Sequence, residues 1–273
     1  MQTVPPSRFS PNLDRISVLA ATILLAYTFA GLINIPVREF AAQLPGIYLE
    51  IEINTQTIVS FLVACLAASG TDWLLREHPS SKNQPLAPHL LLPALTSWVI
   101  GVPLYQRAFG LYWWAGIFMG GGALVLVLIA EFTVVDTNDS NYTLASVGLT
   151  TVAFALFFLL AVTLKASQIR LYLLAPALTL VISFVNLRIY HLRHRGKWAF
   201  QEAGISALIV AQLSIAAFYL PLPPISFGLC LVGPAYGLSS LFGNLGDGKT
   251  WKEAIPEPTI VLAIFLFLAF WLR

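Results

Sequence analysis

The chain has 273 residues, of which 58% are hydrophobic and only 10% are charged, and its formal net charge is +2 at pH 7. A water-soluble fold would have to hide this much apolar surface on both faces of every element, so the composition excludes an ordinary soluble domain. We expect the lipid bilayer to be the solvent of the protein, and we expect no nucleic-acid partner.

Nine apolar stretches are each roughly long enough to cross a bilayer, which takes about 20 helical residues. They are residues 16–35, 57–75, 90–104, 111–134, 142–164, 171–190, 200–220, 225–242 and 259–272. We expect helices, because a helix satisfies its backbone hydrogen bonds internally where water is absent. The predicted fold class is therefore all-α, a polytopic transmembrane helix bundle, with residues 1–273 forming a single integral membrane domain.

The first stretch is predicted to be a membrane span and not a secretory signal peptide. Its apolar run has the length of a full span, and no clear small-residue cleavage site follows it. The long segment before it contains Pro5 and Pro6.

A short β-like segment is predicted near residues 46–54, between the first two spans. Apolar and mostly polar residues alternate there with period two, which is typical of a strand with one apolar and one acidic face. On the extracytoplasmic side, this segment would cap the bundle or receive a partner at its edge, and we favour capping.

The third stretch, residues 90–104, is the weakest of the nine predicted spans. It is short, and it has Pro93 near one end and Pro103 at the other. If it re-enters the membrane instead of crossing it, the number of spans falls to eight and every later loop changes side.

The fourth stretch contains Gly116 and Gly120, which form a Gly-x-x-x-Gly motif. Small residues at this spacing let two membrane helices approach closely. We expect a helix contact within the protein, and the alternative is a contact with a second copy of the chain.

The tetrapeptide Pro-Ala-Leu-Thr occurs twice, at residues 93–96 in the third stretch and at 176–179 in the sixth. Three spans separate the copies, so they run in opposite directions, as in the inverted repeats of secondary transporters. Short matches are common in apolar sequences. We therefore keep an inverted repeat, in which spans three to five correspond to spans six to eight, as an alternative.

The distribution of Lys and Arg predicts the orientation, because positive charge is normally kept on the cytoplasmic side. With a cytoplasmic N-terminus, the inner segments hold ten of the 15 basic residues: Arg8, Arg15, Arg76, Lys82, Arg188, Arg193, Arg195, Lys197, Lys249 and Lys252. The outer segments hold Arg38, Arg107, Lys165, Arg170 and Arg273. The expected location is a bacterial cytoplasmic membrane, with an extracytoplasmic C-terminus if there are nine spans.

Polar side chains gather at or near the inner ends of spans two, four, six and seven. The candidate pocket residues are Asp72, Arg76, Glu131, Asn186, Arg188, His191, Glu202 and Gln212. Helix ends collect such residues at the membrane interface, which is one interpretation. The other is a polar pocket open to the cytoplasm, because ionisable groups within spans usually face the bundle interior. Glu131 is the best candidate, since its own span is otherwise uncharged.

Sequence motifs for catalysis are absent, including His-Glu-x-x-His, Gly-x-Ser-x-Gly and a phosphate-binding Gly-x-x-x-x-Gly-Lys loop. The four His residues, at positions 78, 89, 191 and 194, are all assigned to inner loops or span ends. They lack the Cys or carboxylate spacing of a metal site. We therefore expect no metal, no cofactor and no enzymatic activity.

Three segments resemble a family of bacterial multi-pass membrane proteins known as a domain of unknown function. They are residues 70–79 (GTDWLLREHP), 233–238 (GPAYGL) and 257–261 (EPTIV). The resemblance extends over nearly the whole chain. It implies no activity, cofactor or catalytic residue.

The expected function is that of a non-enzymatic integral membrane protein with a structural or accessory role. Its expected partners are the lipid bilayer and, in addition, other membrane proteins or a second copy of the chain. The alternative is a small-molecule secondary transporter with a cytoplasm-facing pocket. A continuous cavity to the middle of the membrane would favour transport, whereas a solid core would oppose it. Clustering of Asp72, Glu131, His191 and Glu202 would favour an enzyme.

Overall fold

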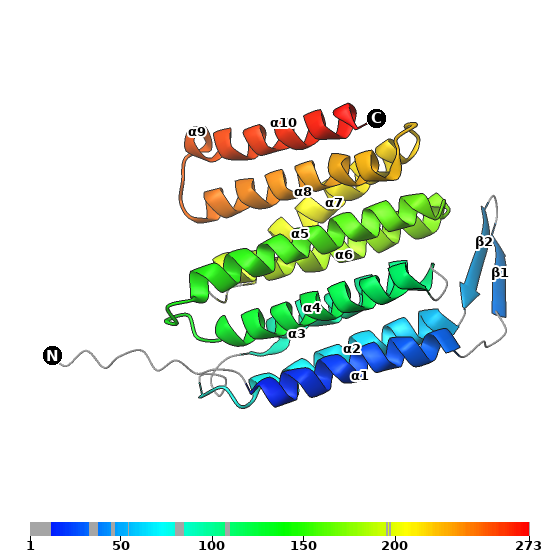
Figure 1. Cartoon of the computed structure of the whole chain (residues 1–273). Coiled ribbons are helices and arrows are strands. Elements are labelled where there is room, and N and C mark those ends of the chain that lie inside the picture. The colour runs from blue at the N-terminus through cyan, green and yellow to red at the C-terminus, as the bar shows by residue number, and fades with distance from the viewer. Residues whose placement is uncertain are drawn as a thin grey trace.

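The computed structural model describes residues 12–32, 38–44, 47–53, 55–79, 85–106, 110–194, 196 and 198–272. These residues form ten helices and two strands (Figure 1). The helices are α1 (Leu13–Leu32), α2 (Thr55–Leu75), α3 (Ala87–Tyr105), α4 (Leu111–Thr133), α5 (Tyr142–Ala166), α6 (Leu171–Arg193), α7 (Phe200–Phe218), α8 (Pro224–Gly246), α9 (Trp251–Ala254) and α10 (Pro256–Trp271). The strands are β1 (Arg38–Leu44) and β2 (Ile47–Ile53).

Within these described residues, nine helices are long and apolar enough to cross a membrane, which confirms the predicted all-α polytopic bundle. The third span is one continuous helix, α3, that begins before the predicted start at residue 90. Pro88 lies in its first turn, where a missing backbone N–H costs nothing, and the helix continues through Pro93 and Pro103. Its 19 residues are long enough for a full span, and its mean hydropathy of 1.4 equals that of α7.

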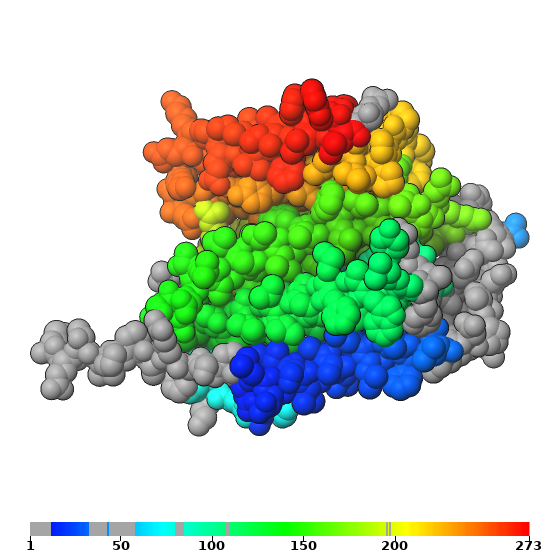
Figure 2. All heavy atoms as spheres, in the orientation of Figure 1, coloured from blue at the N-terminus to red at the C-terminus, as the bar shows by residue number. Residues whose placement is uncertain are grey.

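The long helices are stacked in layers, from α1 and α2 at one edge to α10 at the other (Figure 1). A space-filling view shows the same order along one face of the molecule, from blue α1 to red α10 (Figure 2). Helix α3 contacts α1, α2, α4, α5 and α6 and is 61% buried, whereas the last span is only 17% buried. Helix α3 is thus central, and most of the last span is not covered by the other described residues.

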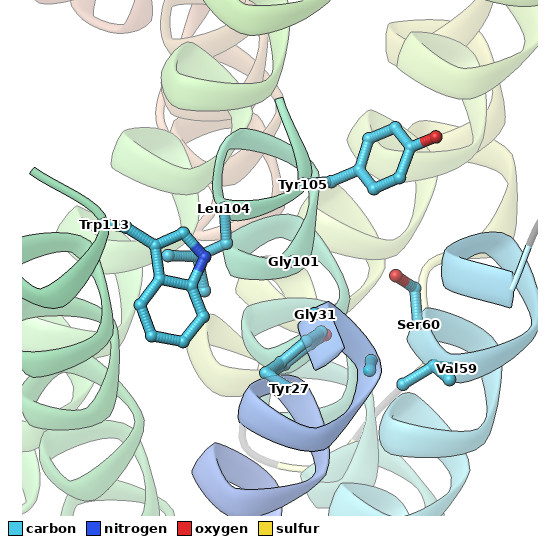
Figure 3. A pocket seen from close by; sticks show the side chains of 9 residues that line it. Tyr27, Gly31, Val59, Ser60, Gly101, Leu104, Tyr105 and Trp113 are labelled. Carbon is cyan, nitrogen blue, oxygen red and sulfur yellow. The ribbon is translucent and has the colours of Figure 1, made fainter. Parts of the chain in front are cut away.

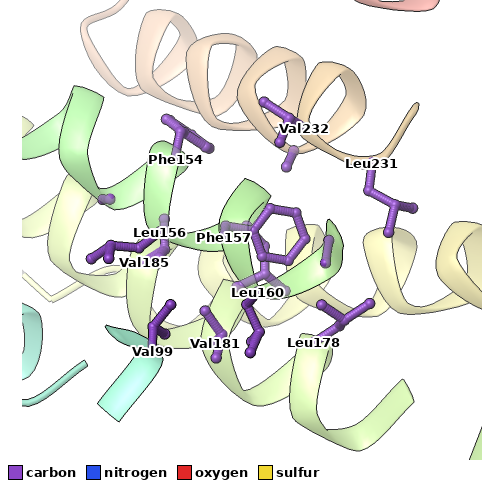
Figure 4. Packing of buried hydrophobic residues seen from close by; sticks show 14 of the residues in the cluster. Val99, Phe154, Leu156, Phe157, Leu160, Leu178, Val181, Val185, Leu231 and Val232 are labelled. Atoms are coloured by element: carbon purple, nitrogen blue, oxygen red, sulfur yellow. The ribbon is translucent and has the colours of Figure 1, made fainter. Parts of the chain in front are cut away.

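Two hydrophobic clusters fill the bundle and meet at α3 and α4. The first joins α1 and α2 to these two helices, and Ile23 and Leu128 are among its fully buried residues. The second joins α3 and α4 to α5, α6, α7 and α8. Phe157, Val181 and Leu231 meet in this second cluster, at about the middle of their helices (Figure 4). Hydrocarbon side chains therefore fill the centre of the larger part of the bundle.

The segment predicted to be β-like near 46–54 is strand β2, as the alternation indicates. Its partner β1 lies directly before it and was not predicted. The two strands pair antiparallel, from Arg38 opposite Ile53 to Leu44 opposite Ile47. This hairpin lies beyond one end of the bundle, at the right of Figure 1.

Glycines let several helices pack closely. A Cβ atom at Gly120 would lie 2.5 Å from Cγ2 of Ile100, and one at Gly116 would lie 2.9 Å from Cδ2 of Leu104, so both glycines of the predicted motif face α3. Gly233 on α8 is used in the same way, since a Cβ there would lie 2.8 Å from Cβ of Phe265 on α10. These are contacts within the chain.

Candidate polar site at one end of the bundle

Four polar side chains from three helices meet at the end of the bundle opposite the hairpin. They are His89 in the first turn of α3, Glu131 in the last turn of α4, and Arg188 and His191 near the end of α6. None is more than 7% exposed. Alternating helix directions bring the start of α3 to the same end as the last turns of α4 and α6.

The centre of this cluster is an ion pair between Glu131 and Arg188, which are 0% and 1% exposed. The Arg188 Nε atom donates to Oε1 of Glu131 at 3.0 Å, and Nη2 of Arg188 donates to Oε2. Two parallel N–H donors fit the two carboxylate oxygens, the strongest geometry for such a pair. Each charge is thus neutralised by the other inside the bundle.

Two histidines contact the pair, and their ring centroids are 6.3 Å apart. His89 places Nδ1 2.9 Å from Oε2 of Glu131 and 3.0 Å from Nη2 of Arg188. His191 places Nδ1 3.3 Å from Nη1 of Arg188. A guanidinium can only donate, so we assign Nδ1 of His191 as the acceptor and its Nε2 as the protonated nitrogen. That Nε2 atom is buried and has no hydrogen-bond partner among the described residues.

A pocket of about 260 Å³ opens beside the cluster. It is lined by Pro85, His89, Val134, Thr137, Tyr142, Arg188, His191, Leu192 and Gly196. Its volume lies just below the range of about 300–1,000 Å³ of sites for drug-sized ligands, so it suits a smaller group. Arg188 lines the pocket, whereas Glu131 does not.

The remaining predicted pocket residues do not join the cluster. Asp72 accepts from Nε of Arg76 at 2.7 Å, as a separate pair near the end of α2, where the Arg76 side chain is 72% exposed. Asn186 is fully buried, and neither of its amide atoms has a partner in the described part of the chain. Glu202 is half-buried at the start of α7, and Gln212 is exposed on that helix.

His89 is the member of the cluster that the candidate residues did not include. The predicted third span begins at residue 90, so His89 fell just outside it, whereas the structure places His89 inside α3. The nearby Pro88 was the available signal, because Pro favours the first turn of a helix.

His78 lies just beyond α2 and packs against Phe132, with ring centroids 4.8 Å apart. Burial lowers the pKa of His78, and the nearby Asp136 and Asp139 carboxylates oppose that shift without reversing it. His78 is therefore neutral at pH 7, and its ring contributes packing near the cluster.

A second polar network lies at the same end, between α6, α8 and the start of α10. Arg193 donates from Nη2 to Oδ2 of Asp247 at 2.6 Å and to Oδ1 of Asn244 at 2.8 Å. Asn244 also accepts from Nζ of Lys249 at 2.9 Å, and its Nδ2 donates to Glu257 at 3.4 Å. The amide of Asn244 thus joins the ends of three helices.

The opposite end of the bundle has a much smaller hollow between α1, α2, α3 and α4 (Figure 3). Its volume is about 30 Å³, enough for one or two water molecules. Tyr27 lies beside Gly101 there and donates its hydroxyl to the carbonyl of Ser97 at 2.6 Å. This contact joins α1 to α3 and leaves no room for a substrate.

The pocket places the side chains of Arg188 and His191 where they can meet a polar group. The Glu131 carboxylate is occupied by Arg188, so it is not free to act as a base. Within the described residues, no group of three His, Cys, Asp or Glu side chains is placed to hold a metal ion.

Comparison with known families gives one match. A family model described as protein of unknown function DUF5656 matches residues 35–272. The chain belongs to this family. No curated protein and no solved structure matches the chain.

Two of the DUF5656 segments noted in the sequence pack against each other. Gly237 of residues 233–238 would bring a Cβ atom 3.6 Å from the carbonyl oxygen of Pro258 in residues 257–261. Ser240 follows on α8 and donates to Oε1 of Glu257 at 3.1 Å. These two motifs therefore form part of the contact between α8 and α10.

Helix α1 lies outside the DUF5656 match and packs on the third segment, residues 70–79. Leu19 of α1 fills the space beside Gly70. The Arg15 guanidinium lies 4.2 Å from the ring centroid of Trp73 and pairs with Glu77. Helix α1 therefore packs on this segment through Arg15 and Leu19.

Proposed function

We propose that this DUF5656 protein is a non-enzymatic, structural or accessory component of a membrane. The observation that carries the proposal is the buried Glu131–Arg188 pair with His89, which ties α3, α4 and α6 together. The charges of Glu131 and Arg188 are paired with each other within the protein, so we assign the pair to holding these helices together. Ionisable groups inside spans are costly unless they are paired in this way.

The solid centre of the bundle supports this proposal over transport. Phe157 on α5, Ile182 on α6 and Ala235 on α8 are all 0% exposed near the middle of their helices. A transported molecule would have to pass this hydrocarbon packing, because transporter sites lie near the middle of the membrane.

We further propose that the end with the cluster faces the cytoplasm, in a single membrane domain with a cytoplasmic N-terminus. Among the described basic residues, this end holds Arg15, Arg76, Arg188, Arg193, Lys249 and Lys252. The other end holds Lys165 and Arg170, with Arg38 in the hairpin. The excess of positive charge supports this orientation.

Side-specific cysteine labelling tests both proposals. In a variant with Cys65 and Cys230 replaced by Ala, we expect a membrane-impermeant maleimide to label Thr137→Cys in inside-out vesicles and not in intact cells. We expect Val181→Cys, in the packed centre, to remain unlabelled from both sides. Labelling of Thr137→Cys in intact cells would contradict the orientation, and labelling of Val181→Cys would contradict the solid core.

A small-molecule transporter with inverted halves is the second candidate, and one local similarity favours it. The two copies of Pro-Ala-Leu-Thr lie at corresponding places, each in the first half of its helix, α3 or α6. The two helices also contact each other. Labelling of Val181→Cys that a solute blocks would support this candidate.

A further inference from the structure

We propose that the pocket beside Arg188 and His191 binds an oxyanion, a phosphate or a phosphate-bearing headgroup. The proposal goes beyond the structural role, because it concerns the donors that this role leaves unused. The ligand would sit in the pocket of about 260 Å³ at the predicted cytoplasmic end.

Arg188 and His191 each have a hydrogen-bond donor without an acceptor among the described residues. Arg188 has five N–H groups, and its Nη1 carries two of them. One reaches Nδ1 of His191, and no acceptor in the described part of the chain takes the other. His191 is 7% exposed, and its protonated Nε2 is also without an acceptor among those residues. Leaving such donors unpaired inside a protein is costly, so an acceptor that reached them would stabilise the protein.

The charged side chain that lines the pocket is the positive one of the ion pair, Arg188. The Glu131 carboxylate is 0% exposed and does not line the pocket, whereas Arg188 does, so a bound anion meets Arg188 first. Helix α3 begins after Pro85, which lines the pocket, but Pro88 in its first turn has no N–H and the His89 N–H donates to the carbonyl of Leu86 at 2.9 Å. The donors available to an anion are therefore side chains, those of Arg188 and His191.

The side chains of Arg188 and His191 are both held in position by their neighbours. Two bonds to Glu131 fix the guanidinium of Arg188. The ring of His191 lies against Trp198, with centroids 5.3 Å apart. Donors that are already held in position lose little conformational entropy when a ligand binds. A small oxyanion can therefore bind to them although it makes few contacts.

The test uses the full-length protein in a mild detergent and compares inorganic phosphate with chloride at equal ionic strength. We expect phosphate to raise the thermal midpoint of the wild type. In His191→Phe, which keeps a ring beside Trp198 and removes the donor, we expect about tenfold weaker phosphate binding or more. His191→Gln retains a side-chain N–H and should recover part of the affinity. His194→Phe makes the same change outside the pocket and should bind as the wild type does.

A second arm identifies the source of the phosphate. The protein is placed in nanodiscs of phosphatidylcholine with or without phosphatidic acid, and retained lipid is measured by native mass spectrometry. Retention of phosphatidic acid that His191→Phe abolishes, without an effect of inorganic phosphate, would assign the site to a lipid headgroup. An effect of inorganic phosphate would assign it to a free oxyanion.

The proposal is overturned if neither probe binds, or if His191→Phe and His191→Gln, both with wild-type helicity by circular dichroism, bind as the wild type does. The structural role of the Glu131–Arg188 pair does not depend on this outcome, because it is measured by stability and not by ligand binding.

Discussion

Arg188 and Arg193 lie five residues apart on α6, and each pairs with a carboxylate, yet their surroundings differ greatly. The side chains of Arg188 and Glu131 are 1% and 0% exposed, whereas those of Arg193 and Asp247 are 30% and 40% exposed. The first pair faces the centre of the bundle, and the second reaches the end of α8. One helix thus carries a pair that depends on the protein for its solvation and a pair that water can solvate.

The largest expected effect is at the buried pair. Glu131→Gln keeps the shape of the side chain and leaves the Arg188 charge without a counter-ion, so we expect a loss of about 3–5 kcal/mol in the free energy of unfolding. Unfolding in mixtures of mild detergent and dodecyl sulfate would measure it.

The matched control for this substitution is Glu77→Gln. Glu77 pairs with Arg15, and both side chains are about a third exposed (37% and 29%). We expect a loss of no more than about 1 kcal/mol. Equal losses in the two variants would show that burial does not distinguish these pairs.

An intermediate effect is expected from Gly243→Ala, which displaces Arg193 without removing its charge. The added Cβ would lie 2.7 Å from Cδ of Arg193, so the side chain must shift, and we expect this shift to weaken its bonds to Asp247 and Asn244. We expect a loss of about 1–3 kcal/mol, measured by the same unfolding experiment.

Gly122→Ala is the control for that change, because nothing lies within 4 Å of a Cβ at Gly122. The extra methyl group should leave stability unchanged or raise it by up to about 1 kcal/mol, through helix propensity. A similar loss of stability in Gly243→Ala and Gly122→Ala would show that the loss comes from adding a methyl group to a helix and not from displacing Arg193.

The smallest effect is expected at the exposed pair. Asp247→Asn should cost about 0.2–1 kcal/mol at low salt. Because the Debye length falls to about 3 Å at 1 M salt, the difference from the wild type should vanish there, whereas the effect of Glu131→Gln should persist. Unfolding at low and high salt checks this, and a salt-independent loss at Asp247 would remove the contrast between the two pairs.

The spans were predictable because length and hydropathy are local properties of the sequence. The stretch at 171–190, for example, corresponds to α6, which ends only three residues later, at Arg193. Strand β2 was predictable for the same reason, since the alternation at 46–54 has the period of a strand. Strand β1 was not, because Phe40-Ala41-Ala42 interrupts any alternation and its pairing is visible only in the hairpin.

The site was only partly predictable, because its partners are distant in sequence. Glu131 was chosen because its span carries no other charge, but its partners lie 42 residues before it and 57 after it. Hydropathy places these residues at the same end of the bundle and gives no rotation about each helix axis. That rotation brings Arg188 to Glu131 and leaves Gln212 on the outer surface.

The separation of 57 residues between Glu131 and Arg188 also has a consequence for synthesis. At about 5–20 residues per second, Arg188 is made about 3–11 s after Glu131. His89 precedes both in the chain and reaches the same carboxylate oxygen at 2.9 Å. A newly inserted α4 therefore finds its first polar partner in α3, and α6 completes the ion pair only after α5 has been made.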